Sequence, residues 1–167
     1  MKNSRIEWTD HTVNPWWGCI KVSDGCKHCY AEDLTAYHDE WIRLAYRMER
    51  GEKMKLWGPG SRRPVRIDPA IAELAGHAAD KSLGRPPRVF IPSMGDLFEE
   101  LKEEHEDYWA VDDARRRLFA YIAAEPRLRY QLLTKRPENI ERMVPPTWLN
   151  DWPEHVWIGA SVETPEY

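Results

Sequence analysis

The stretch RVFIPSMGD, residues 88–96, decides the fold that we predict for this chain. It is a short apolar run that ends in small and polar residues. Two later stretches repeat this arrangement, RYQLLTKR at residues 129–136 and VWIGASVE at residues 156–163. Helical patterns separate the three runs, and alternating strands and helices are typical of βα units around a parallel sheet. We therefore predict an α/β fold.

The other elements follow from apolar periodicity and from the positions of Gly and Pro. Residues 12–14 are a candidate first strand, which Pro15 limits. Helices are predicted over residues 30–48, 70–83, 97–124 (with a break near residues 106–107) and 138–143, and a Pro- and Trp-rich loop over residues 145–153.

Length and composition suit one domain that spans residues 1–167, because the chain has 167 residues and is 42% hydrophobic. The mean hydropathy is −0.71, and no apolar run reaches the roughly 18 residues that a membrane span needs. No apolar signal-peptide core follows Met1, so we expect a cytoplasmic protein. A net charge of −4 argues against coating nucleic acid by bulk charge, but it leaves a local basic groove open.

All three cysteines of the chain lie close together: Cys19, Cys26 and Cys29, in a loop over residues 18–30 with the spacing C-x6-C-x2-C. Three is an odd number for a disulfide framework, and disulfides rarely persist in the cytoplasm. Clustered thiols in that setting indicate a metal site. Zinc would need a fourth ligand, for which His11, His28 and His38 are candidates. A four-iron cluster on three thiolates would instead keep one iron open to a ligand.

Polar side chains follow each predicted strand. Because ligands of parallel α/β sheets and barrels bind at the carboxyl ends of the strands, we expect these side chains to converge on one edge. The alternative is that they are ordinary turn and cap residues. The residues concerned are Ser93 and Asp96, Thr134 and Lys135, and Ser161 and Glu163.

Four ordered blocks resemble a phage- and prophage-associated three-cysteine protein family of unknown function, which is described as radical-SAM-like. The blocks are NPWWGC with GCKHCYAE in residues 14–32, SMGDLF at 93–98, LTKRP at 133–137 and GASVE at 159–163. The resemblance spans nearly the whole chain. The first cysteine gap is six residues here, against three in the commonest radical-SAM spacing, and His28 stands where an aromatic residue is usual.

The resemblance implies a partial (β/α) barrel of radical-SAM type with a [4Fe–4S] cluster on Cys19, Cys26 and Cys29. S-adenosylmethionine would bind the open iron, and its reductive cleavage would give a radical that takes hydrogen from a substrate. The expected contacts are Ser93 and Asp96 with the methionine amino end, Lys135 with its carboxylate, Tyr30 or His28 with the adenine, and Ser161 and Glu163 with the ribose. The host would be a bacterium or a phage-infected cell.

The barrel is expected to be truncated after about four parallel strands, so that the chain is either the N-terminal part of a longer barrel or a minimal form that needs a partner. An exposed edge at the last strand would then favour self-association. Arginine clusters make a nucleic acid a candidate substrate, with solvated surface as the alternative. The competing function is a non-enzymatic phage interaction module that binds zinc through three Cys and one His. A third possible function is a phage-encoded interaction protein whose cluster is only structural.

Overall fold

The computed structural model describes residues 3–35 and 54–161, and within them the predicted α/β fold is confirmed. Four parallel strands form one sheet in the order β1-β2-β3-β4, so each strand pairs with the next one along the chain. The strands are β1 (His11–Thr12), β2 (Arg88–Ile91), β3 (Arg129–Thr134) and β4 (Val156–Ala160). The helices are η1 (Asp24–Cys26), α2 (Ile67–Ala79), α3 (Tyr108–Ala124), η2 (Pro137–Asn139), α4 (Ile140–Met143) and α5 (Pro146–Asn150).

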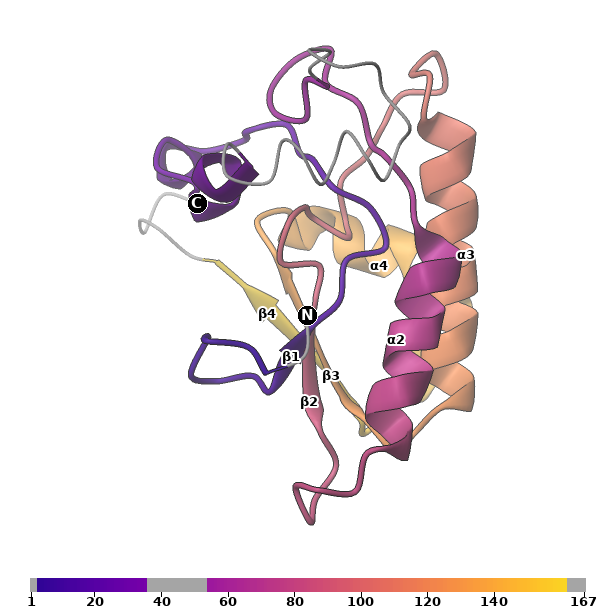
Figure 1. Cartoon of the computed structure of the whole chain (residues 1–167). Helices are drawn as coiled ribbons and strands as arrows, with labels where there is room; N and C mark the ends of the chain where they lie inside the picture. Colours follow the sequence, from indigo (N-terminus) through magenta and orange to yellow (C-terminus); the bar gives the residue numbers. More distant parts are fainter. Residues whose placement is uncertain (1–2, 36–53, 162–167) are drawn as a thin grey trace.

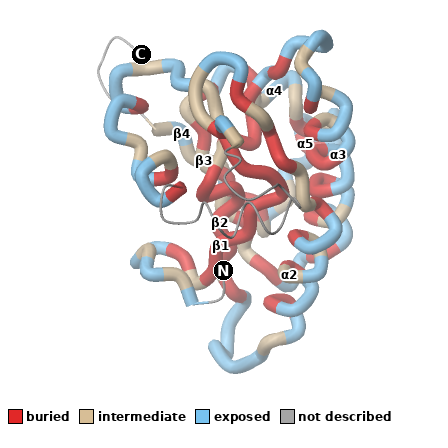
Figure 2. Tube along the Cα trace, turned by 45° about the horizontal axis from the view of Figure 1, so that its top comes forward, coloured by how far each residue is buried: buried red, intermediate tan, exposed pale blue. Residues whose placement is uncertain are grey.

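The helices α2 and α3 pack side by side against one face of the sheet (Figure 1). Alternation along β3 explains the packing, because Tyr130, Leu132 and Thr134 are buried while the residues between them are only partly covered. The buried positions of β3 meet the apolar faces of the helices, which include Leu74 of α2 and Leu118 of α3. Figure 2 shows this as buried tube along the strands and exposed tube on the outer sides of the helices.

The opposite face of the sheet carries no helix in the part of the chain that the structure describes. The N-terminal segment (residues 3–10) lies against this face instead (Figure 1). Its Trp8 ring packs on Phe90 of β2, with the ring centroids 4.8 Å apart. Asp10 fixes the segment, since its carboxylate accepts hydrogen bonds from the Arg85 guanidinium and from the main-chain N–H of Arg88.

Of the helical stretch predicted over residues 97–124, the part after the predicted break near residues 106–107 is confirmed as α3, which begins at Tyr108, and the part before it is wrong. Two side chains hold residues 97–101 in another conformation. The carboxylate of Asp96 accepts the N–H of Phe98, as in an Asx turn. The Arg115 guanidinium donates to the carbonyls of Leu97 and Glu99, so these carbonyls accept from a side chain instead of from the main-chain N–H groups of a helix.

Other boundaries differ by a few residues from the prediction. The first strand is His11–Thr12 rather than residues 12–14, and α2 begins at Ile67 rather than at residue 70 and ends at Ala79. The loop over residues 145–153 contains α5, which has a proline in its first turn. Of the helix predicted over residues 30–48, residues 30–35 are helical and residues 36–48 lie outside the described residues. No helix in the described ranges has the length and apolar character needed to cross a membrane.

Truncating the core side of β3 tests the packing between the sheet and the helices. Leu132 is 1% exposed, so Leu132→Ala should lower the free energy of unfolding by about 2–5 kcal/mol through the cavity that it leaves. The matched control is Leu149→Ala on α5, where the side chain is 51% exposed and the cost should stay within about 0.5 kcal/mol. Urea unfolding of both variants measures the difference, and equal losses would contradict the assigned core.

Acidification should loosen the N-terminal segment. Hydrogen bonds from Arg85, assisted by the N–H of Arg88, hold the pKa of Asp10 well below its usual range, although burial acts to raise it. Ionised Asp10 therefore stabilises the folded chain fully above the unfolded-state pKa of about 3.9, and this contribution is lost as the pH falls through the lower folded-state pKa. We expect the unfolding free energy of Asp10→Asn to fall less than that of the wild type between about pH 5 and about pH 2. Asp113→Asn, at an exposed site on α3, should keep the wild-type pH dependence; an Asp10→Asn profile parallel to the wild type would refute the assignment.

Candidate functional site

The segments that follow the four strands meet at one edge of the sheet, as predicted from the parallel order. The main chain joins them directly. The N–H of Gly18, after β1, donates to the carbonyl of Met94, after β2, at 2.9 Å. The N–H of Ser161, after β4, donates to the carbonyl of Thr134 at the end of β3, also at 2.9 Å. The carboxyl edge (residues 13–19, 92–96, 134–136 and 161) is therefore one continuous structure.

Ser93 and Tyr30 lie together at this edge. The Tyr30 hydroxyl donates to the Ser93 carbonyl at 2.7 Å, which brings the helical residues after the cysteine loop onto the sheet. Asn14 holds the other side, because its amide donates to the Ser93 hydroxyl at 3.1 Å and its Oδ1 accepts the N–H of Met94 at 2.8 Å. Burial, assisted by Cys29, raises the pKa of Tyr30 to about 12, so its hydroxyl keeps the proton that this hydrogen bond needs.

Asp96 is buried and joins β2 to β3. One carboxylate oxygen accepts the Thr134 hydroxyl at 2.7 Å, and the other accepts the N–H of Lys135 at 3.1 Å and the Arg136 guanidinium at 2.8 Å. The contact of Asp96 with a ligand amino group stays a prediction, and such a contact would compete with these bonds.

Three charged residues that the sequence analysis did not single out connect the cysteine loop to the sheet. Arg136 donates to Sγ of Cys19 at 3.4 Å and to the carbonyl of Ile20 at 2.6 Å. Glu99 accepts the N–H of Ile20 at 2.7 Å and two hydrogen bonds from Arg63, at 2.6 and 2.7 Å. Arg136 directly follows the predicted Lys135, and Glu99 stands three residues after Asp96, so both lie within the sequence blocks already noted or next to them.

The start of the cysteine loop is bonded on both sides of Cys19 to one segment of main chain, residues 56–58. Cys19 donates its N–H to the carbonyl of Leu56 at 3.0 Å and accepts the N–H of Gly58 at 3.0 Å. Gly18 has a φ of +98°, and a Cβ at this position would lie 2.5 Å from the Leu56 carbonyl oxygen. Only glycine combines this backbone conformation with so close an approach, so Gly18 fixes where Cys19 stands.

The three thiols are all free, and their surroundings differ. Burial, together with the carboxylates of Glu99 and Asp96, raises the pKa of Cys19 to about 12, although Arg136 acts in the opposite direction. Burial also acts to raise the pKa of Cys26, but hydrogen bonds at Val22 and Ser23 and the charge of Lys135 lower it below its ordinary value. Cys26 is therefore the more readily ionised of the two.

Positive charge gathers around the thiols. The pKa of Lys21 is raised, first by its hydrogen bond with Glu32 and further by Cys29 and Cys26. Lys21 contacts Glu32 at 2.6 Å, next to the helical residues that follow Cys29. With Lys135 acting on Cys26 and Arg136 on Cys19, each thiol has a cationic side chain in its surroundings.

The sulfurs are not gathered around one centre, however. Within residues 3–35 and 54–161, no three His, Cys, Asp or Glu side chains are placed so as to hold a metal ion. Of the histidines considered for zinc, His11 is buried and stacks on His77 with the ring centroids 3.9 Å apart. His28 is exposed in the loop itself, and His38 lies outside the described residues, as does Glu163.

The arginine clusters are largely engaged within the fold. The buried Arg115 binds main-chain carbonyls, as described above. Carboxylates pair with many of the others: Arg62 with Asp107, Arg66 with Glu73, Arg85 and Arg88 with Asp10, Arg116 with Asp112, Arg117 with Asp68, and Arg127 with Glu125. These pairings favour the solvated-surface interpretation of the clusters and give the nucleic-acid prediction no support.

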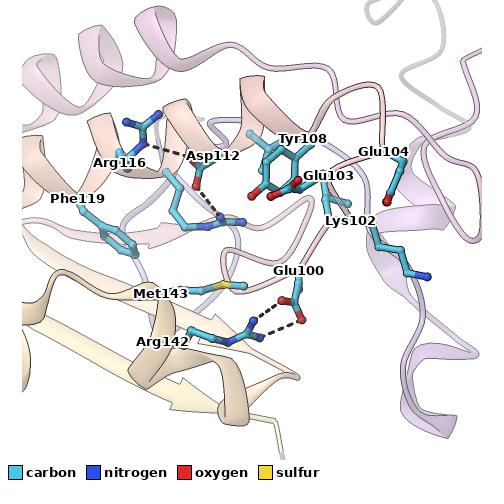
Figure 3. A pocket seen from close by; sticks show the side chains of 13 residues that line it. Glu100, Lys102, Glu103, Glu104, Tyr108, Asp112, Arg116, Phe119, Arg142 and Met143 are labelled. Carbon is cyan, nitrogen blue, oxygen red and sulfur yellow. Dashed lines mark hydrogen bonds and ion pairs between the residues drawn. The ribbon is translucent and has the colours of Figure 1, made fainter.

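A cavity of about 750 Å³ lies away from the cysteine loop, between α3, α4 and residues 100–104 (Figure 3). Two of its arginines pair with carboxylates of the same wall, Arg142 with Glu100 and Arg116 with Asp112 (Figure 3). None of the predicted site residues lines it. We therefore place the candidate site at the carboxyl edge of the sheet.

Removing one charge from the buried group tests how the loop is held. Glu99→Gln leaves Arg63 buried without its counter-charge, so the unfolding free energy should fall by about 3 kcal/mol or more, and Cys19 should react faster with iodoacetamide. The neighbouring Glu100→Gln breaks an exposed pair with Arg142 and should cost no more than about 1 kcal/mol, with no change in Cys19 reactivity. The two variants behaving alike would show that the buried group does not hold the loop.

Comparisons with known proteins place the chain in a family. A search of curated proteins and a search of solved structures each found no match. A family model described as "Protein of unknown function (DUF5131)" matches residues 3–167. Since this match covers almost the whole chain, including every strand and all three cysteines, the chain belongs to the DUF5131 family.

Proposed function

We propose that this protein is a radical-SAM-like iron–sulfur protein. Cys19, Cys26 and Cys29 would hold a [4Fe–4S] cluster, and S-adenosylmethionine would bind beside it at the carboxyl edge. The observation that carries the proposal is the position of the loop: three free thiols, each with a cationic neighbour, follow the first strand of a parallel α/β sheet at the edge where such sheets bind ligands.

Charge supports a cluster at this loop. A cluster on three thiolates is anionic, and an anion at a partly buried site needs fixed positive charge nearby. Arg136 brings positive charge to the Cys19 sulfur, although it shares that charge with the carboxylates of Asp96 and Glu99. Its N–H points at the Cys19 sulfur, and hydrogen bonds to cluster sulfurs are a known means of tuning such sites.

Binding requires the loop to close. Cys19 is held by Gly18, Leu56 and Arg136, so it is the fixed ligand. Cys26 belongs to η1, where the described main-chain hydrogen bonds are local: Cys26 to Ser23, and Lys27 to Asp24. The thiols would lose protons as they bind.

The chain's own residues would bind and orient S-adenosylmethionine at the same edge. Tyr30 and Ser93 already contact each other there, and the charge of Lys135 acts on Cys26. Ser161 follows β4 on the neighbouring segment, and Glu163 is predicted to act beside it. When bound, the cluster supplies one electron for reductive cleavage of S-adenosylmethionine; the protein binds, orients and excludes water.

Anaerobic reconstitution with iron and sulfide tests the proposal. The wild-type chain should retain iron and acid-labile sulfide in equal amounts and, with dithionite as reductant, cleave S-adenosylmethionine to methionine and 5′-deoxyadenosine. Each of Cys19→Ala, Cys26→Ala and Cys29→Ala should lose the iron and sulfide, because each removes one of the three thiolates that would hold the cluster. Val22→Ala, in the same loop, is the matched control, because this side chain is 48% exposed, and the variant should retain both.

Three other outcomes would redirect the proposal. Zinc without sulfide, lost in His28→Ala, would establish a zinc-binding module of the Cys3His kind instead. A retained cluster without binding of S-adenosylmethionine would indicate a structural cluster. If the wild-type chain binds no metal, both the iron–sulfur proposal and the zinc-binding alternative are wrong.

A further inference from the structure

The helix-free face of the sheet carries a row of side chains that runs across the strands. The register pairs Thr12 with Phe90, Phe90 with Gln131 and Gln131 with Trp157, so these residues are aligned across all four strands. Alternation places them on the face opposite α2 and α3, because their neighbours Val89, Tyr130 and Val156 belong to the helix-side core. This row lies nearer the middle of the strands than the carboxyl edge.

A cleft of about 380 Å³ opens on this face. Trp8 and Trp157 both line it, and they are 43% and 50% exposed. The other lining residues come from β3 and β4: Gln131, Leu132, Leu133, Ile158 and Gly159. Small-molecule sites have cavities of roughly 300–1,000 Å³ with mostly apolar walls and a few fixed polar groups. The cleft matches that description, with the Gln131 amide as its polar group.

The Gln131 amide leaves an acceptor without a partner. Its Nε2 donates to the main-chain carbonyl of Trp8 at 3.2 Å, while its Oε1 is buried and makes no hydrogen bond. A carbonyl can only accept, so this contact fixes which end of the amide is nitrogen. A buried acceptor without a donor is unfavourable, and a ligand that brings an N–H would satisfy it.

The two tryptophans stand at fixed places. Trp157 is carried by β4, which pairs with β3 along its length. Trp8 is held against Phe90, and the Asp10 contacts with Arg85 and Arg88 secure its segment. Gly159, two residues after Trp157 on the same face, has no side chain that would fill the cleft.

We propose that this cleft binds the base of a free nucleoside. An indole ring offers a flat surface on which any nucleobase can stack, and stacking of this kind contributes to binding without regard to sequence. The amide of Gln131 has to turn toward the cleft on binding, because its Oε1 is buried; it can then accept an N–H of the base, as glutamine does when it contacts adenine. A nucleoside fits better than a nucleic-acid strand, because the arginines that could contact a phosphate backbone are largely paired with carboxylates. The inference does not rest on the proposed cluster, since none of the residues at the cleft belongs to the cysteine loop or to the carboxyl edge.

Calorimetric titration of the metal-free chain with adenosine, guanosine, cytidine and uridine tests the inference, with purine riboside as the analogue of adenosine that lacks the exocyclic amine. At least one nucleoside should bind saturably. Trp157→Ala should weaken binding roughly tenfold or more by removing a stacking surface. Trp109→Ala is the matched control, because Trp109 is 68% exposed on α3 and should leave the affinity unchanged.

Gln131→Leu separates the hydrogen bond from the stacking. If adenosine binds, this variant should weaken it roughly tenfold, the effect of one lost hydrogen bond to a buried partner, and should leave purine riboside unaffected. Thermal melting checks that both cleft variants stay folded; if Gln131→Leu does not fold, the Trp157→Ala and Trp109→Ala pair still decides the question. The inference is overturned by absence of saturable binding, by equal affinity in Trp157→Ala and the wild type, or by binding of single-stranded oligonucleotides without binding of any nucleoside.

Discussion

The candidate site depends on a chain of buried charges beneath the cysteine loop. Arg63, Glu99, Arg136 and Asp96 alternate in sign, and each is at least nine-tenths buried. Their main partners are one another, the Cys19 sulfur and the main chain of the loop, so the charges that burial would penalise are compensated in place. Breaking any one of these ion pairs leaves an uncompensated charge in the interior. Alternative arrangements of these side chains are therefore unfavourable.

The buried chain connects parts that are distant in sequence. Arg63 precedes α2, Glu99 follows β2, and Arg136 follows β3. Gly18 adds a steric constraint to these ionic ones, because the Leu56 carbonyl leaves no room for a side chain. The first cysteine is thus set by the sheet, whereas Cys26 lies in the short helix η1 with local hydrogen bonds. The sheet thus fixes the first thiol of the loop, while Cys29 packs against the small buried cluster of Trp17, Ala31, Leu56 and Met94.

The sheet could be predicted from sequence because its signals are local. The three stretches that begin at Arg88, Arg129 and Val156 are strands at or within a residue of the predicted positions, and their parallel order follows from the helices between them. The polar residues that end them do meet at one edge. What failed was the stretch after Asp96, where helical composition was overridden by hydrogen bonds from Arg115, a residue on the far side of the same segment.

The buried charges escaped prediction for a different reason. Arg63 and Glu99 belong to stretches that resemble charged surface, and nothing in the sequence near either residue indicates that they meet. The same limit applies to the cleft, since Trp8 comes to Gln131 only through the fold of the N-terminal segment. The placement of Glu163 and His38 lies outside the described residues, so their predicted roles rest on the sequence alone.

The alternation along β3 has a consequence for which amino-acid substitutions this protein can accept. Tyr130 and Leu132 face the helices, and Gln131 and Leu133 face the opposite side, so one strand serves two purposes through separate sets of side chains. Substitutions at the second set can alter what the outer face recognises while the first set keeps the domain folded. Single substitutions on the outer face can therefore change which ligand is preferred without destabilising the fold.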